Sequence, residues 1–154
     1  MAFSEDHVRW MREAIARARL AATEGEVPIG AVGVVDGRVV GRAHNVRERT
    51  HDPLGHAELL LLQNLARETK SWRLEDVAVY VTCEPCLMCA GAMLQARIPK
   101  VIYGCRDPKA GAMGSLYDVS HDPRLNHRID VIPDVLSEEC AELLSDFFRG
   151  LRGE

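Results

Sequence analysis

Hydrophobic and polar positions follow two different periods along this chain, and these periods predict helices and strands in turn. In residues 5–24 the apolar side chains recur every three or four positions: Val8, Met11, Ile15, Ala18 and Ala22. This spacing places them on one face of an amphipathic helix. Ser4 is suited to cap the start of the helix, and Gly25 is suited to end it.

Short apolar runs rich in β-branched residues predict five strands. The first two, residues 31–35 and 38–41, flank Asp36-Gly37, a dipeptide that favours a two-residue hairpin turn. The other three strands are expected at residues 77–82, 101–104 and 129–132.

Three further helices are predicted at residues 56–68, 86–97 and 137–151. Ser137 is placed to cap the last of them. Residues 45–55 are polar and include Pro53 and Gly55, so they predict a loop. A second loop is expected at residues 106–127, and loops of this length in compact domains usually carry function or move.

Helices interleaved with apolar strands predict an α/β fold, a three-layer α/β/α domain. Its mixed five-stranded sheet would have helices on both faces. The hairpin strands are expected to be antiparallel, and the later strands, which crossovers separate, are expected to be parallel. A length of 154 residues predicts that residues 1–154 form a single domain.

Composition excludes several classes of protein. An apolar content of 47% excludes intrinsic disorder. No stretch approaches the roughly 18 uncharged apolar residues that a membrane span needs. The N-terminus is acidic where a secretory signal would be basic, so a cytoplasmic location is expected.

The net charge of −4 argues weakly against a nucleic-acid partner and favours a small substrate. Residues 97–128, however, hold six Lys or Arg against three Asp, a net charge of +3. This segment is either a local basic surface or an ordinary solvated one.

Three of the five cysteines stand close together, at Cys83, Cys86 and Cys89. In a reducing compartment an odd, clustered set of cysteines indicates metal binding or catalysis rather than disulfides. His56, Cys86 and Cys89 together offer one imidazole and two thiolates, which suit Zn²⁺ and leave its fourth position open for catalysis. Two alternatives stay open: a buried histidine with inert thiols, and a structural zinc closed by Cys83. Cys105 is most simply a small core residue.

Glu58 follows His56 by two positions. At ideal helical spacing the two side chains would point about 200° apart, so Glu58 is not expected to bind the same metal. At the first turn of a helix it could still reach a metal-bound water, which is the position of a general acid/base.

Motifs along most of the chain resemble those of the bacterial tRNA-specific adenosine deaminases, members of the zinc-dependent cytidine/deoxycytidylate deaminase superfamily. The H-x-E and P-C-x-x-C motifs around His56 and Cys86 are the signature of zinc nucleobase deaminases in general. Further motifs, which narrow the resemblance to the tRNA enzymes, lie at residues 26–31, 43–45, 80–82, 84–86, 88–92, 107–109, 114–116, 126–128 and 147–149.

The resemblance implies hydrolytic deamination of adenosine to inosine at the wobble position of a tRNA anticodon. It implies that His56, Cys86 and Cys89 bind one Zn²⁺ per chain and that Glu58 shuttles protons. It also implies a cytidine-deaminase-like fold and a homodimer. In this chain Leu54-Gly55 and Cys83 depart from the usual Thr-Ala and Leu of the family.

The resemblance also implies the residues that contact the substrate. Asn45 is expected to hold the extruded base. The pocket walls are expected to be Val27, Pro28 and Ile29. Candidate contacts with the anticodon stem-loop are Asp107, Lys109, Phe148, Arg149 and Arg152. Phe148 and Arg152 are four residues apart, a spacing at which one helix face can offer both stacking and phosphate contact to RNA.

Two other functions compete with this one. A small-molecule deaminase acting on guanine, cytosine or cytidine would not need the loop at 106–128 or the Phe-Phe-Arg sequence at 147–149. A zinc-stabilised nucleic-acid-binding module without activity would need neither Glu58 nor an open position on the metal.

Overall fold

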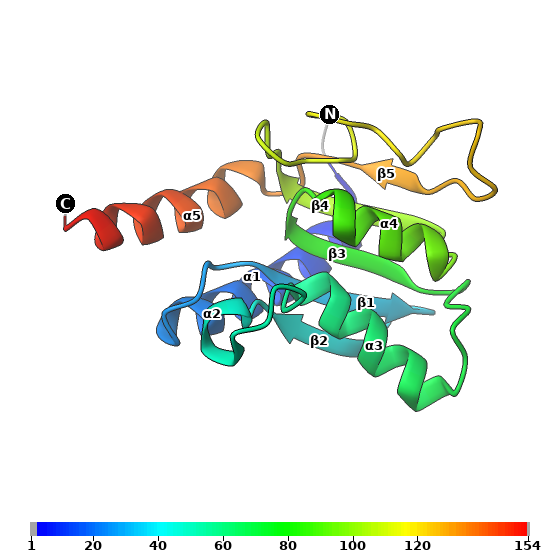
Figure 1. Ribbon diagram of the computed structural model, residues 1–154, viewed down its shortest axis with the longest axis horizontal. Coiled ribbons are helices and arrows are strands. Elements are labelled where there is room, and N and C mark those ends of the chain that lie inside the picture. The colour runs from blue at the N-terminus through cyan, green and yellow to red at the C-terminus, as the bar shows by residue number, and fades with distance from the viewer. Residues whose placement is uncertain (1–2, 154) are drawn as a thin grey trace.

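The computed structural model describes residues 3–153, which form a mixed five-stranded sheet with helices on both faces (Figure 1). The strands are β1 (Gly30–Val35), β2 (Arg38–His44), β3 (Ala78–Cys83), β4 (Lys100–Cys105) and β5 (Asp130–Ile132). Their order across the sheet is β2-β1-β3-β4-β5. β1 is antiparallel to β2 and to β3, whereas β3, β4 and β5 are mutually parallel. The predicted fold class, hairpin and parallel strands are therefore confirmed.

Two hydrophobic clusters, one on each face of the sheet, hold the layers together. On one face α3 (Ala57–Thr69) and α4 (Leu87–Gln95) bury Leu61 and Met93 against Val79 and Val81. On the other face α1 (Glu5–Thr23) and α5 (Ser137–Arg152) cover Tyr80 and its neighbours. Alternate residues of β3 thus enter opposite clusters, which is why this strand is apolar throughout.

Local signals act as the sequence predicts at several element ends. The Ser4 side chain accepts a hydrogen bond from the His7 backbone N–H at 3.2 Å and caps α1. Gly25 follows α1 with φ of +78°. Asp36 and Gly37 have φ of 50° and 72°, the left-handed pair that a type I′ hairpin turn requires.

The structure corrects four predicted boundaries. The expected loop at 45–55 contains a short helix, α2 (Arg47–Thr50). β2 continues to His44 rather than ending at residue 41, because its last residues pair with the start of β1. α4 ends at Gln95 because Arg97 takes a left-handed φ of 64°. Ser137 is the first helical residue of α5; Leu136 occupies the cap position and makes no side-chain cap hydrogen bond.

The strand ends and helix N-termini that position the functional site lie together at one end of the molecule. The carboxyl ends of β3 and β4 and the N-termini of α3 and α4 meet there, and α5 projects past the sheet on the same side (Figure 1). Ligands of open α/β sheets bind at the carboxyl ends of the parallel strands. Within residues 3–153, none of the helices combines the length and apolar character needed to cross a membrane.

Candidate active site

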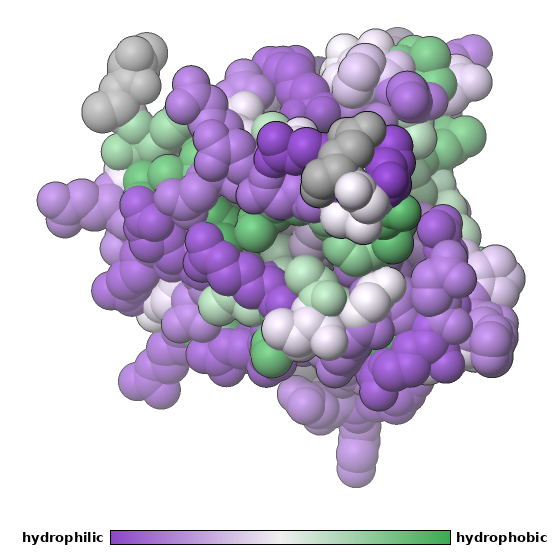
Figure 2. Space-filling model, turned by 90° about the vertical axis from the view of Figure 1, so that its left-hand side faces the viewer, coloured by the Kyte–Doolittle hydropathy of each residue, from purple (hydrophilic) through white to green (hydrophobic). Residues whose placement is uncertain are grey.

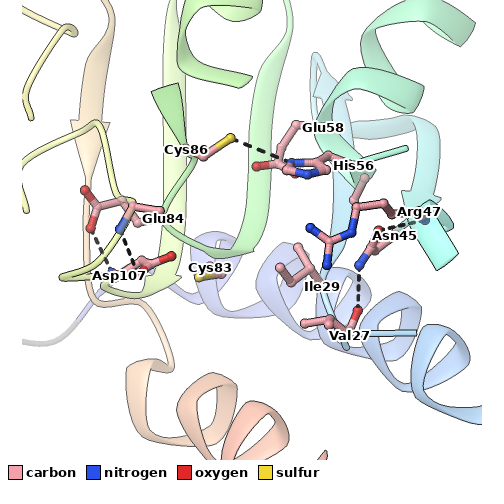
Figure 3. Close-up of a pocket in the computed structure, with 12 residues that line it drawn as sticks. Val27, Ile29, Asn45, Arg47, His56, Glu58, Cys83, Glu84, Cys86 and Asp107 are labelled. Atoms are coloured by element: carbon pink, nitrogen blue, oxygen red, sulfur yellow. Dashed lines mark hydrogen bonds between the residues drawn. The ribbon is translucent and has the colours of Figure 1, made fainter. Parts of the chain in front are cut away.

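The three predicted metal ligands meet where α3 and α4 begin. His56 is the residue at the N-cap of α3 and Cys86 the one at the N-cap of α4, while Cys89 lies in the first turn of α4. The Nδ1 atom of His56 is 3.7 Å from the Cys86 sulfur and 3.4 Å from the Cys89 sulfur (Figure 3). All three donor atoms lie within 4.8 Å of one another, and residues 3–153 contain no other such group. One imidazole nitrogen and two thiols are a donor set that fits Zn²⁺.

The surroundings favour the thiolate form that binds metal. The hydrogen bond from Cys89, together with His56, lowers the pKa of the Cys86 thiol to about 4. The N-terminal end of α4 adds the positive end of a helix dipole at the same place. Cys86 is therefore prepared to act as an anionic ligand.

Glu58 lies beside this donor group rather than pointing away from it (Figure 3). The prediction that the His56 and Glu58 side chains point apart assumed that His56 is helical. Its backbone is instead extended, with φ of −81° and ψ of 145°. The Glu58 carboxyl is buried, and burial raises its pKa to about 7. A carboxyl with this pKa can hold or release a proton near neutral pH.

A cavity of about 210 Å³ opens onto the donor group. This volume lies below the roughly 300–1,000 Å³ of pockets for drug-sized ligands, so it suits one ring system such as a nucleobase. Val27 and Ile29 line it as predicted, but Pro28 is buried and is not among the lining residues. The remaining lining residues are Asn45, Arg47, His56, Ala57, Glu58, Cys83, Glu84, Cys86, Asp107 and Ala110.

The Asn45 amide is held in one orientation beside Val27 and Arg47 (Figure 3). Its Nδ2 donates to the Val27 carbonyl at 3.3 Å, and its Oδ1 accepts from the Arg47 backbone N–H at 3.1 Å. The side chain is buried, with 6% of its surface exposed. The fixed amide can therefore read a ligand's polar edge at low entropic cost.

Two charged lining residues, Arg47 and Glu84, carry no predicted role. Glu84 belongs to the Glu-Pro-Cys motif, but its sequence position does not say what its carboxylate contacts. In the structure the carboxylate accepts backbone N–H bonds from Asp107, Met113 and Ser115 at 3.0–3.1 Å, and a hydroxyl bond from Ser115 at 2.5 Å. Glu84 thus fastens the loop that follows β4 to the floor of the site.

Cys83 lines the cavity but lies outside the donor group. It is paired with Cys105 across β3 and β4 and packs in the cluster beneath α1 and α5. This placement argues against Cys83 as the fourth ligand of a structural zinc. It agrees with the packing role that its position at a strand end predicts, and Cys105 is buried in the same cluster.

The candidate RNA contacts lie outside the cavity, with the exception of Asp107. The Asp107 carboxylate accepts N–H bonds from Lys109 at 3.0 Å and from Ala110 at 3.2 Å, and so shapes the loop that exposes the Lys109 side chain. On α5, Phe148 is 42% exposed, and Arg149 forms an ion pair with Asp146. Arg152 ends the same helix. The surface at this end is mostly hydrophilic, with hydrophobic side chains gathered toward its middle (Figure 2).

A second buried carboxylate, that of Glu26, anchors α2 beside the cavity. It is fully buried and accepts the backbone N–H groups of Glu48 at 3.0 Å and Arg49 at 2.6 Å. We expect Glu26→Gln to lower the free energy of unfolding by about 1–3 kcal/mol, because an amide NH₂ would face a backbone donor. Urea unfolding measures this effect. The exposed Glu48→Gln is the matched control and should stay within about 0.5 kcal/mol of the parent; equal losses in both variants would contradict the anchoring role of Glu26.

Comparison with known proteins places this site in a family. A family model described as MafB19-like deaminase matches residues 5–152. The tRNA-specific adenosine deaminase of Bacillus subtilis (strain 168) is 47% identical over 143 residues, covering 93% of this chain and 89% of that protein. The protein of the same name from Haemophilus influenzae is 42% identical over 152 residues, covering 98% of this chain and 88% of that protein.

Solved structures agree with the sequence relatives. A structure from a study of A-to-I editing by tRNA:A34 deaminases at the wobble position of transfer RNA superimposes with a TM-score of 0.85 at 40% identity, covering 88% of this chain and 99% of that one. A guanine deaminase from Nitrosomonas europaea, at 18% identity and a TM-score of 0.76 over 96% of this chain and 86% of that one, shares the fold. The chain therefore belongs to the family of tRNA-specific adenosine deaminases.

Proposed function

We propose that this protein is a zinc-dependent hydrolase that converts adenosine to inosine at the wobble position of a tRNA anticodon. One observation carries the proposal: a His-Cys-Cys donor group and a buried Glu58 face the same cavity, whose size suits a single base. The relatives named above, which match nearly the whole chain, support adenosine in tRNA as the substrate.

The chain's own residues account for the steps of the reaction. Zinc, which His56, Cys86 and Cys89 would hold, would supply a water whose pKa is lowered to near 7. Glu58 takes a proton from the attacking water and delivers it to N1 of adenine while oxygen bonds to C6. Glu58 then moves the remaining proton of that oxygen to the amino group, the bond between C6 and this nitrogen breaks, and ammonia leaves. Adenosine and water thus give inosine and ammonia.

The walls of the cavity hold the base in place for this chemistry. Val27 and Ile29 present apolar surface to the ring, and the fixed amide of Asn45 can hydrogen-bond its edge. A base must be extruded from a structured loop to enter, which costs a few kcal/mol. We infer that contacts beyond the base itself offset this cost, and that they are supplied by Asp107 at the cavity and by Lys109, Phe148, Arg149 and Arg152 outside it.

The test compares a tRNA anticodon stem-loop with free guanine, cytosine and cytidine, measuring inosine and ammonia. We expect turnover of the stem-loop alone. The double variant Lys109→Ala/Arg152→Ala should bind the stem-loop more weakly and with a shallower salt dependence, because fewer counterions are released. Its zinc content should equal that of the parent.

Arg38→Ala is the matched control for charge. Arg38 is exposed and begins β2 at the end of the sheet opposite the site, about 20 Å from the strand's last residue. This variant should keep the parent's salt slope. If the double variant binds the stem-loop like the parent and with the same salt slope, Lys109 and Arg152 are not RNA contacts. If the parent readily deaminates free bases but does not deaminate the stem-loop, the proposed substrate is wrong.

We further propose that the protein acts in the cytoplasm, where its substrate would be, as a homodimer built from single-domain chains. Support for self-association comes from an apolar groove between α3 and α4, which is lined by Leu59, Leu62 and Trp72 among others. Trp72 beside this groove is 57% exposed, and large exposed apolar patches mark interaction surfaces.

A further inference from the structure

Cys83 and Cys105 form a pair of thiols at the edge of the active-site cavity. They are register partners on the parallel strands β3 and β4, and both side chains enter the same hydrophobic cluster. Cys83 also lines the cavity. Only 6% of Cys83 and 5% of Cys105 is exposed, so a reagent reaches the pair by entering the cavity that Cys83 lines. Neither residue belongs to the metal-binding group.

The geometry of the pair is close to that of a disulfide. Partners on neighbouring strands lie about 4.7–4.9 Å apart, which falls within the roughly 4.4–6.8 Å between the Cα atoms of disulfide-bonded cysteines. The Cys105 thiol donates to the Thr82 carbonyl at 3.5 Å, and the neighbouring Cys83 thiol lowers the pKa of Cys105, whereas the pKa of Cys83 is raised. Cys105 is therefore the thiol of the pair that reacts more readily with an oxidant.

We propose that Cys83 and Cys105 are an oxidation site at which hydrogen peroxide forms a reversible disulfide that slows catalysis. One thiol attacks peroxide, giving a sulfenic acid and one water. The second thiol attacks that sulfur, forming the S–S bond and releasing a second water. Two thiols and one peroxide thus become one disulfide and two waters.

Formation of the bond would disturb the cavity through Glu84. This residue follows Cys83, and its backbone N–H donates to the Cys105 carbonyl at 2.8 Å. Its carboxylate holds Asp107 and the following loop. Drawing the two sulfurs together to about 2.05 Å would pull on the strand ends that carry these contacts. The expected loss of turnover rests on the proposed function.

The experiment treats the zinc-loaded protein with hydrogen peroxide, and reads intact mass, cross-linked peptides, zinc content and stem-loop turnover. We expect a mass loss of two hydrogens, a Cys83–Cys105 peptide, retained zinc and a fall in turnover on the order of tenfold or more, since a displacement of about 1 Å can cost up to 10²-fold. Dithiothreitol should restore the parent's turnover.

Three variants make the result specific. Cys83→Ala and Cys105→Ala should form no cross-link, and treated and untreated samples of each should turn over at the same rate. Cys140→Ala removes another buried thiol of the same cluster and should respond to peroxide as the parent does.

Three outcomes would overturn the proposal. The site is wrong if peroxide leaves Cys83 and Cys105 free, or if the only cross-link joins Cys86 to Cys89 and zinc is released. Its effect on catalysis is wrong if the Cys83–Cys105 bond forms and turnover is unchanged. Absence of stem-loop turnover in the untreated protein would instead count against the proposed function, because the cross-link is read by mass and does not depend on activity.

Discussion

Glu58→Gln should lose most of the deaminase activity, on the order of 10²-fold or more, while fold and zinc content stay at the parent's values. Acid–base groups contribute about 10²–10⁴-fold to enzymatic rates, and glutamine cannot carry the proton. The side chain is buried beside the donor group but is not itself a member of it. The substitution keeps the volume, so it removes the proton transfer and little else.

The measurements are stem-loop turnover, zinc per chain and urea unfolding. Glu48→Gln makes the same chemical change at an exposed position on α2, and it should match the parent in all three. Near-normal turnover of Glu58→Gln would exclude Glu58 as the proton shuttle. Loss of zinc together with activity would show that the carboxyl acts through the metal site instead.

The way both helices begin explains how these groups come together. His56 and Cys86 each occupy an N-cap, where the backbone is extended and the side chain can turn toward the neighbouring helix. Glu58 and Cys89 then lie in the first turns of the same helices. A ligand at each N-cap and one functional group within each first turn produce a compact site from two short motifs.

Much of the fold was predictable because it depends on local periodicity. The stripe containing Met11 and Ile15 predicts α1, and the apolar run around Val79 predicts a strand buried on both faces. The motifs likewise identify the three donors and Glu58, but the extended backbone of His56, which lets Glu58 lie beside the donors, was not predicted from the spacing. The periodicity and the motifs require no knowledge of distant contacts.

The features that sequence did not predict depend on tertiary contacts. α2 is too short to show a period, and its N–H groups are satisfied by Glu26, more than twenty residues earlier. Arg47 and Glu84 become cavity walls only when α2 and the loop after β4 fold over the site. Pro28 and Ile29 are adjacent in sequence, yet only Ile29 lines the cavity, while Pro28 is buried.

Cys86→Ala should lose most of its zinc, whereas Cys83→Ala should retain about one zinc per chain. The two thiols are three positions apart and both line the cavity, so they are a matched pair. Only Cys86 lies in the donor group with His56 and Cys89. Removing a residue that merely supports a ligand costs about 10–100-fold in metal affinity, so the loss of the ligand itself should cost at least as much.

The zinc content per chain, measured after dialysis against a weak chelator, shows which of the two cysteines binds the metal. Cys83→Ala also controls for a general loss of stability. The Cys83 side chain packs in the core, so its replacement should lower the free energy of unfolding without releasing zinc. If Cys83→Ala loses zinc while Cys86→Ala keeps it, the ligands are misassigned. If both lose it equally, Cys83 closes a four-ligand structural site, and the open coordination position that catalysis requires does not exist.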